Sequence, residues 1–163
     1  MVESGDVWMI DKRVVNFICK AKKQAYASTD SKPKKTKDGG ETYSIKEGDL
    51  LYTDTYFGSV VDCGQERVYC KGKVIWIMAY RGGIFEKHQH LHREAFSFLK
   101  KCISKIPKNF PARGPKSLKI GKFRYENKWI GNIEGFVGEE NIYYDGNKIC
   151  FRNYIGGLIK NRK

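Results

Sequence analysis

The chain has 163 residues, of which 40% are hydrophobic and 13% aromatic. This length is typical of one domain with a packed core, and the composition excludes an intrinsically disordered chain. No apolar run approaches the roughly 18 residues that cross a bilayer, and the N-terminus lacks the apolar stretch of a secretory signal. Five cysteines without a CxxC pair favour reduced thiols. We therefore expect a cytoplasmic protein that does not contact membranes.

The formal net charge is +13, and it is unevenly distributed, because no acidic residue lies between Glu94 and Glu126. A basic surface of this kind attracts polyanions such as nucleic acid. A lysine-rich surface that serves only solvation is the simpler interpretation, because no known nucleic-acid-binding module is present. The candidate polyanion-binding residues are Lys100, Lys101, Lys105, Lys108, Arg113, Lys116, Lys119, Lys122 and Arg124.

After a lead-in over residues 1–9, apolar residues recur at helical spacing in two segments, residues 10–27 and 88–106. Asp11 is a suitable N-cap for the first helix, and Pro107 ends the second. The polar stretch 28–41 predicts an exposed loop. Residues 107–119 hold three of the four prolines and form a basic connector.

Segments rich in β-forming residues follow each helix, and Lys71-Gly72-Lys73 and Asp145-Gly146 favour hairpin turns within them. We expect Gly64-Gln65 to interrupt the first set of strands and Arg81-Gly82-Gly83 to end it. The strands predicted in the first set are 42–45, 49–57, 59–63, 67–70 and 74–80. Those predicted in the second are 121–130, 133–137, 141–144 and 148–154.

The two sets of strands resemble one another. Residues 64–84 align with residues 138–158 at an offset of 74, and eight of the 21 aligned positions are identical. The apolar stripes of the helices also correspond. We therefore predict a single domain over residues 1–163, with internal repeats at 10–84 and 88–159. Its fold class is α+β: two αββββ repeats related by a pseudo-twofold axis, with antiparallel sheets packed against two helices. The strand order is not readable.

Few residues suggest chemistry. His88, His90 and His92 are weak candidates for a metal site, because His88 and His92 share one face of a helix. An exposed, polar helix start is the alternative, and no further ligand is identifiable. No phosphate-binding glycine loop and no nucleophile motif occurs, so we expect no cofactor and assign no catalytic residue.

Repeated carboxylates and aromatic residues suggest a crevice between the repeats. Glu66 and Glu140 occupy equivalent positions and could act in acid–base chemistry if the pseudo-twofold axis brought them together. Bracing of each strand turn by an ion pair is the structural alternative. The aromatic residues could equally be core residues or line a ligand pocket. The candidate ligand-binding residues are Glu66, Trp76, Tyr80, Arg113, Trp129, Glu140 and Tyr154.

The chain also resembles a known family. The order Asp49-Leu-Leu-Tyr52-Thr-Asp54-Thr-Tyr56-Phe-Gly58, then Gly64-Gln-Glu66, Gly72-Lys-Val-Ile75-Trp76 and Tyr154-Ile-Gly156-Gly157 is similar to a family of uncharacterised microbial domains. The resemblance covers about residues 14–159. Members occur alone or behind a repressor-type helix-turn-helix module, which we do not expect here. The family implies no established activity, cofactor or catalytic residue.

Three functions follow as hypotheses. The first is a non-enzymatic domain that senses a small ligand or binds a protein through the crevice. The second is a polyanion-binding protein that uses the basic residues between 100 and 128. The third is an enzyme with Glu66, Glu140 or Arg113 in its site. The sequence does not define the oligomeric state.

Overall fold

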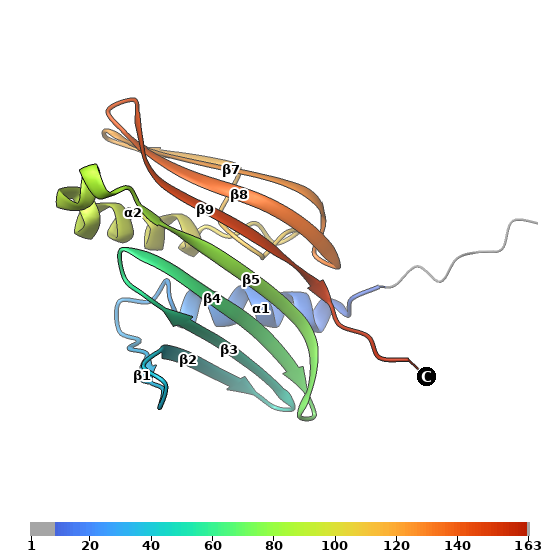
Figure 1. The fold of residues 1–163 in the computed structure, drawn as a ribbon. Helices are drawn as coiled ribbons and strands as arrows, with labels where there is room; N and C mark the ends of the chain where they lie inside the picture. The colour runs from blue at the N-terminus through green and yellow to red at the C-terminus, as the bar shows by residue number, and fades with distance from the viewer. Residues whose placement is uncertain (1–8, 163) are drawn as a thin grey trace, which may run out of the picture.

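Two amphipathic helices lie on the same face of one antiparallel sheet in the computed structural model, which describes residues 9–162 (Figure 1). Helix α1 spans Lys12–Gln24, and α2 spans His92–Ser104 after a short 3-10 helix, η1, at Glu86–Leu91. Both helices are shorter than predicted. The Asp11 side chain accepts a hydrogen bond from the Arg13 backbone N–H at 2.8 Å and so caps α1, as expected. Neither described helix is long and apolar enough to cross a membrane.

The strands form one sheet of nine in the order β1-β2-β3-β4-β5-β9-β8-β7-β6, and every pair is antiparallel. The α+β class is confirmed, but the strands join in a single sheet rather than in separate ones. The strands are β1 (Lys34–Lys35), β2 (Glu41–Glu47), β3 (Leu50–Phe57), β4 (Val61–Cys70), β5 (Lys73–Ile84), β6 (Ser117–Ile120), β7 (Phe123–Asn132), β8 (Gly135–Tyr144) and β9 (Asn147–Leu158). The lead-in expected at residues 1–9 lies, apart from Met9, outside the described residues.

Several predicted strand boundaries are wrong. Strand β1 lies within the predicted loop 28–41, β6 begins within the connector 107–119, the predicted strands 133–137 and 141–144 join in β8, and β9 runs past residue 154. The breaks predicted at Gly64 and at Gly82 are also wrong, because the sheet continues through both glycines. Strand β4 runs through Gly64, which pairs with Tyr80 of β5. A Cβ atom on Gly64 would lie only 2.5 Å from the Tyr80 hydroxyl oxygen, so this glycine makes room for the tyrosine ring. Strand β5 likewise continues through Gly82, where a Cβ atom would lie 2.7 Å from the Cβ of Arg152. Both glycines permit close packing within the sheet.

The two meanders β2–β5 and β6–β9 meet through their last strands. At this junction Tyr80 of β5 is the register partner of Tyr154 of β9. The row of partners through this pair continues outward on both sides as Tyr80, Gly64, Tyr56 and as Tyr154, Gly138, Trp129. Since register partners point to the same face, the aromatic residues of this row all face the helices.

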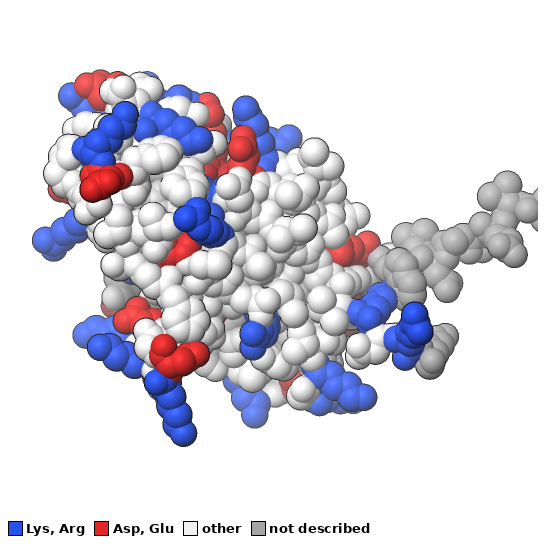
Figure 2. Space-filling view, viewed as in Figure 1, with Lys and Arg blue, Asp and Glu red and all other residues white. Residues whose placement is uncertain are grey.

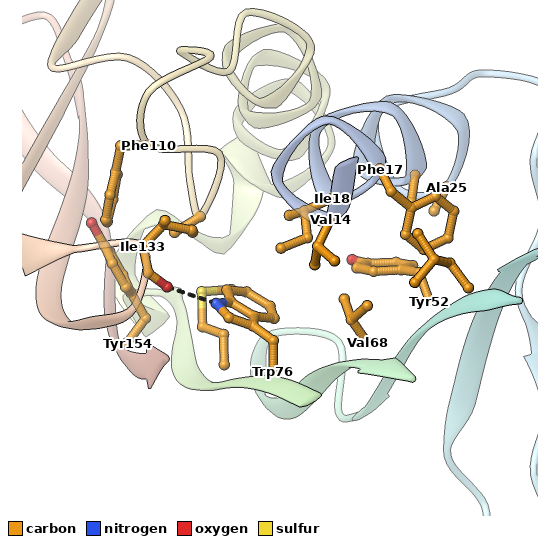
Figure 3. Packing of buried hydrophobic residues seen from close by; sticks show 14 of the residues in the cluster. Val14, Phe17, Ile18, Ala25, Tyr52, Val68, Trp76, Phe110, Ile133 and Tyr154 are labelled. Atoms are coloured by element: carbon orange, nitrogen blue, oxygen red, sulfur yellow. Dashed lines mark hydrogen bonds between the residues drawn. The ribbon is translucent and has the colours of Figure 1, made fainter. Parts of the chain in front are cut away.

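The hydrophobic core lies between the helices and the sheet and has two clusters. Helix α1 places Val14, Phe17 and Ile18 against one of them. In this cluster the buried Trp76 donates its indole N–H to the carbonyl of Ile133 at 2.9 Å, and Phe110 and Tyr154 pack nearby (Figure 3). Helix α2 covers the second cluster with Phe98, Leu99 and Ile103. The apolar stripes predicted for both helices are therefore the surfaces that pack on the sheet.

The opposite face of the sheet is turned to the viewer in Figure 2, and its centre is largely free of charged atoms, with lysines and arginines scattered mostly toward the rim. Register partners Ile155, Val137 and Ile130 run across β9, β8 and β7 and are exposed. The two edge strands are the shortest in the sheet, with two residues in β1 and four in β6.

Candidate functional site

A cavity of about 210 Å³ lies between the two helices and the sheet. Its walls come from α1, α2, strands β2 to β5 and β9, and the connector, so residues from both predicted repeats contribute. Half-buried or exposed residues surround its opening, among them Tyr26, Glu41, Tyr56, Ser59, His92 and Phe96. Buried polar residues form its floor, namely Lys22, Tyr52, Asp54, Asp62, Glu66, Tyr80, Arg113 and Arg152.

Arg113 sits between the two glutamates that occur at equivalent positions of the predicted repeats. Its Nε donates to Glu140 Oε2 at 3.0 Å, and its Nη2 donates to Glu140 Oε1 in a two-point pair. Its Nη1 lies 4.0 Å from Glu66 Oε1. Tyr125 also donates its hydroxyl to Glu140 at 2.5 Å. Burial is the largest single effect and would raise the pKa of Glu140. The charge and hydrogen bonds of Arg113, the charge of Arg152 and the hydrogen bond from Tyr125 together outweigh burial and hold the pKa below its ordinary value, so Glu140 is ionised.

Arg152 closes the polar network on the β9 side. Its guanidinium donates to both carboxylate oxygens of Asp62, with Nη2 2.8 Å from Oδ2, and its Nε lies 3.4 Å from Glu140 Oε1. Its guanidinium carbon also lies 4.9 Å from the centre of the Tyr80 ring. Two-point pairs of this kind fix both side chains. Arg152 and Arg113 therefore share Glu140 and form one connected network of charges.

Lys22 enters the network from α1. Its ammonium contacts Glu66 Oε2 and donates to the carbonyl of Ala112 at 2.6 Å. The side chain is almost wholly buried, and this desolvation lowers the pKa of Lys22 despite the favourable charge of Glu66. A buried lysine at the edge of a cavity is a group whose charge a ligand can change.

Asp54 is an almost wholly buried carboxyl group in the lining of the cavity. Its Oδ1 accepts a hydrogen bond from the Tyr80 hydroxyl at 2.7 Å. Burial first, and the negative charge of Glu66 second, raise the pKa of Asp54 to about 7. Perturbed groups of this kind cluster at functional sites, because a buried group that changes charge near neutral pH responds strongly to a ligand.

The structure brings some of the predicted ligand-binding residues together and leaves others apart. Glu66, Tyr80 and Arg113 line the cavity, and Glu140 contacts it through Arg113. Trp76, Trp129 and Tyr154 do not line it. Trp76 and Tyr154 are buried in the α1 cluster, where Trp129 packs against them, and the Trp129 ring stacks on Phe110 with ring centres 4.3 Å apart.

Sequence reasoning missed Lys22, Asp54, Asp62 and Arg152. Two of them carry a signal in the sequence, although the helical pattern predicts Lys22 off the apolar stripe, which is wrong. Lys22 lies four residues after the buried Ile18, on the apolar stripe of α1, and Asp54 alternates with Tyr52 and Tyr56 along β3. A charged residue at a position that periodicity assigns to the core needs a buried partner. Arg152 and Asp62 are 90 positions apart, and no pattern in one sequence links them.

The histidine run does not form a metal-ligand set. His88 and His90 lie in η1, which is a 3-10 helix, so the α-helical spacing assumed for His88 and His92 does not apply. His92 instead contacts the Ser59 carbonyl oxygen at 2.9 Å and stacks on Phe96 at the opening of the cavity. Within residues 9–162 no group of three histidine, cysteine or acidic residues could hold a metal ion.

The candidate polyanion-binding residues are not all at the surface. Arg113 is 5% exposed and belongs to the buried network, so it cannot contribute to a basic surface. Lys116 lies over the Trp129 ring, and Arg124 pairs with Glu126 and stacks on Tyr143. Lys122 pairs with Asp145, and Lys100 lies over the Tyr26 ring. Lys101, Lys105, Lys108 and Lys119 are exposed.

The comparisons with known proteins give a family and no function. A family model described as "Domain of unknown function (DUF5680)" matches residues 54–159, which include strands β4 to β9, α2 and most of the cavity. The chain therefore belongs to this family of unknown function. The comparison with curated proteins found no match, and neither did the comparison with solved structures.

Proposed function

We propose that the protein is a non-enzymatic sensor that binds a small ligand in the cavity between its two helices and the sheet. The main observation that supports this proposal is the cavity of about 210 Å³, whose floor consists of buried, ionisable side chains from both halves of the chain. A cavity of about 150 Å³ is large enough for benzene, so a ligand with one or two rings fits this space.

The energetic cost of the floor supports a binding role. Each buried charge loses several kcal/mol of hydration, and a buried pair is often no more stabilising than apolar residues of the same volume. Replacing Lys22, Glu66 and Arg113 together by apolar residues such as methionine or leucine would therefore give a protein of similar stability. A network of this kind beneath an opening is explained by recognition of polar groups on a ligand.

We further propose that the two halves arose by duplication, so that the cavity has a counterpart in the second half. Several details support this. The register of β4 and β8 shifts at matching positions, Val68/Tyr69 and Ile142/Tyr143. The turn residues Lys71 and Asp145 share a φ of 49°. The central partners Tyr80 and Tyr154 are equivalent to one another under the predicted offset of 74.

The place of action and the mode of signalling belong to the same proposal. The free thiols of the five cysteines favour the reducing cytoplasm. The resemblance to domains that follow helix-turn-helix modules suggests that ligand binding controls a partner. The third hypothesis, an enzyme, would use Glu66, Glu140 or Arg113, and Asp54 lies in the same cavity as Glu66 and Arg113.

Ligand binding can be tested by ligand-observed NMR with a library of ring-sized fragments and the full chain. We expect a set of fragments whose signals show binding to the wild type and not to Ser59→Trp, which obstructs the opening. The ring at position 59 leaves the backbone carbonyl that contacts His92 in place. Lys148→Trp, a surface tryptophan outside the cavity lining, is the matched control and should bind the same fragments. Binding that Ser59→Trp does not change, or no binding at all, would refute the proposal.

Polyanion binding is a second candidate, favoured by the net charge of +13 and by the exposed Lys101, Lys105, Lys108 and Lys119. Gel mobility shift with double-stranded DNA and single-stranded RNA at low salt tests it. If these lysines bind phosphates, affinity must fall steeply with salt and must weaken when all four are changed to glutamine. No retardation at low salt excludes this function.

A further inference from the structure

The second half of the sheet contains an aromatic stack at the position that corresponds to the cavity. Trp129 occupies in β7 the position that Tyr56 occupies in β3, since Trp129 pairs with Gly138 and Tyr56 with Gly64. The Phe110 ring lies parallel to the Trp129 ring, with an interplanar angle of 2° and 4.3 Å between ring centres. Phe110 also meets Phe136 edge to face at 5.2 Å. A flat ring from the connector thus fills this space.

Beside Tyr56 the corresponding space is open. Tyr56 lines the cavity, and its ring partner Tyr43 lies at 6.4 Å. Its hydroxyl donates to Glu41 at 2.7 Å, which fixes the ring at the wall. Among residues 9–162, those that line this space leave the cavity of about 210 Å³ between them. In the second half, the Phe110 ring fills the matching space. The cavity in the first half therefore has room for an aromatic ring that a ligand would supply.

The polar groups beneath the two rings also differ. In the second half, Tyr154 donates its hydroxyl to Asn127 at 2.6 Å, and the Asn127 amide donates to the Gly114 carbonyl at 2.8 Å. The amide is therefore used within the protein. In the first half a carboxyl group, Asp54, accepts from Tyr80 through Oδ1. Asp54 lines the cavity, and among residues 9–162 no hydrogen bond to its second carboxylate oxygen, Oδ2, is described.

The charges of the lining favour a cation. Four carboxyl groups line the cavity, from Glu41, Asp54, Asp62 and Glu66. Three cations line it, from Lys22, Arg113 and Arg152, and the two arginines also share Glu140 behind the lining. Asp62 contacts Arg152, and Glu66 contacts both Lys22 and Arg113. Among the contacts described, Asp54 and Glu41 each receive only a phenol hydrogen bond, from Tyr80 and Tyr56. Since the pKa of Asp54 is raised to about 7, a positively charged N–H group placed beside it would favour the ionised carboxylate and form a charge-assisted hydrogen bond with it.

We propose that the ligand is a flat aromatic cation, such as an aryl amidine or a protonated N-heterocycle, whose ring stacks on Tyr56 and whose N–H groups bind Asp54. This inference rests on the proposed small-ligand function and specifies its ligand class. The ring takes the place that Phe110 takes over Trp129. Stacking on a tyrosine face adds to the attraction for a cationic ring.

Titration calorimetry with the full chain tests the proposal, with benzamidine as the probe. Benzoate has the same ring with the opposite charge, and cyclohexanecarboxamidine has the same charge without a flat ring. We expect benzamidine to bind at least tenfold more tightly than either. Asp54→Asn should weaken benzamidine binding at least tenfold, because it removes the charge and keeps the acceptor for Tyr80. Glu126→Gln, which removes a carboxylate outside the cavity lining, should not change it.

Each outcome decides a separate point. If benzamidine fails to bind while other fragments bind in a Ser59-dependent way, the ligand class is wrong and the proposed function stands. If benzoate binds as tightly as benzamidine, or Asp54→Asn binds benzamidine as well as the wild type, the assignment of Asp54 is wrong. If neither benzamidine nor any fragment binds, both proposals fail. A thermal melt of each variant confirms that it is folded before titration.

Discussion

Tyr80 and Tyr154 are register partners at the centre of the sheet, yet their hydroxyl groups donate to different kinds of side chain. Tyr80 donates to the carboxyl group of Asp54, and Tyr154 donates to the amide of Asn127. The backbone around the two tyrosines is alike, since each tyrosine also pairs with a glycine, Gly64 or Gly138. The polar site beneath Tyr80 is therefore a titratable version of the site beneath Tyr154.

Asp54 makes stability depend on pH. An aspartate in an unfolded chain has a pKa of about 3.9, and in the folded protein the pKa of Asp54 is raised to about 7. Between these values the folded protein holds a proton that the unfolded chain has released. The free energy of unfolding should therefore fall as pH rises from about 4 to about 7, and the penalty should stay constant above that.

Asp54→Asn should remove this contribution, since Asn127 shows that an amide fits beneath Tyr154, the register partner of Tyr80. We expect the variant to gain stability relative to the wild type as pH rises from 5 to 8, by a few kcal/mol at most. Urea unfolding at pH 5, 6, 7 and 8 measures the difference. Asp145→Asn, at an exposed turn, is the control. A difference between Asp54→Asn and wild type that does not vary with pH would contradict the elevated pKa.

Gly64 should tolerate no side chain. A Cβ atom there would lie 2.5 Å from the Tyr80 hydroxyl oxygen and 2.7 Å from the Tyr56 Cβ. We expect Gly64→Ala to destabilise the protein by about 1–3 kcal/mol, because the added methyl group overpacks the row. Gly135→Ala is the matched control, since nothing lies within 4 Å of a Cβ atom at this strand position. Urea unfolding measures the stability of both variants. Equal stabilities would show that the side chains of Tyr80 and Tyr56 move aside for the added methyl group at little cost.

Glu140 should matter more than a surface carboxylate. Glu140→Ala leaves Arg113 and Tyr125 without their acceptor in the interior. We expect a loss of about 3–5 kcal/mol, the usual cost of a buried charge that loses its partner. Glu126→Ala, which breaks the partly exposed pair with Arg124, should cost less than about 1 kcal/mol. Chemical unfolding measures both, and a small effect of Glu140→Ala would mean that water replaces the carboxylate.

Phe110→Ala should empty the space over Trp129. Removing a buried phenylalanine side chain costs about 3–5 kcal/mol, and the Trp129 fluorescence spectrum should shift because its stacked neighbour is gone. If the two spaces correspond as proposed, added indole should bind the variant and restore part of the lost stability. A thermal melt with and without indole checks this, with the wild type as control. No stabilisation of Phe110→Ala by indole would argue against the correspondence.

The sequence predicted the elements that depend on local pattern. The stripes of α1 and α2 follow a 3.6-residue period, and hairpin glycines such as Gly72 and Gly146 occur where a positive φ is needed, so these elements were correctly predicted. The strand breaks predicted at Gly64 and Gly82 are wrong. At both positions the absence of a Cβ atom leaves room for a side chain of the neighbouring strand. A single sequence contains no signal for that neighbour.

The candidate site was predicted only in part for the same reason. Glu66, Tyr80 and Arg113 stood out through the repeat or through the connector, and they do line the cavity. Trp76 and Trp129 were included because they are aromatic, but packing within the core explains both. Asp62 and Arg152 meet only because β5 and β9 lie side by side, and the strand order that places them so was not readable.

The shortness of β1 and β6 has a consequence beyond the fold. A wide open sheet with long outer strands exposes unpaired backbone groups on which other chains can polymerise. Here one edge strand, β1, has two residues, both lysines, and the other, β6, has four residues that include Lys119. Short outer strands that carry lysine disfavour pairing with a second molecule, so lengthening either one with apolar residues should increase the tendency of the protein to aggregate.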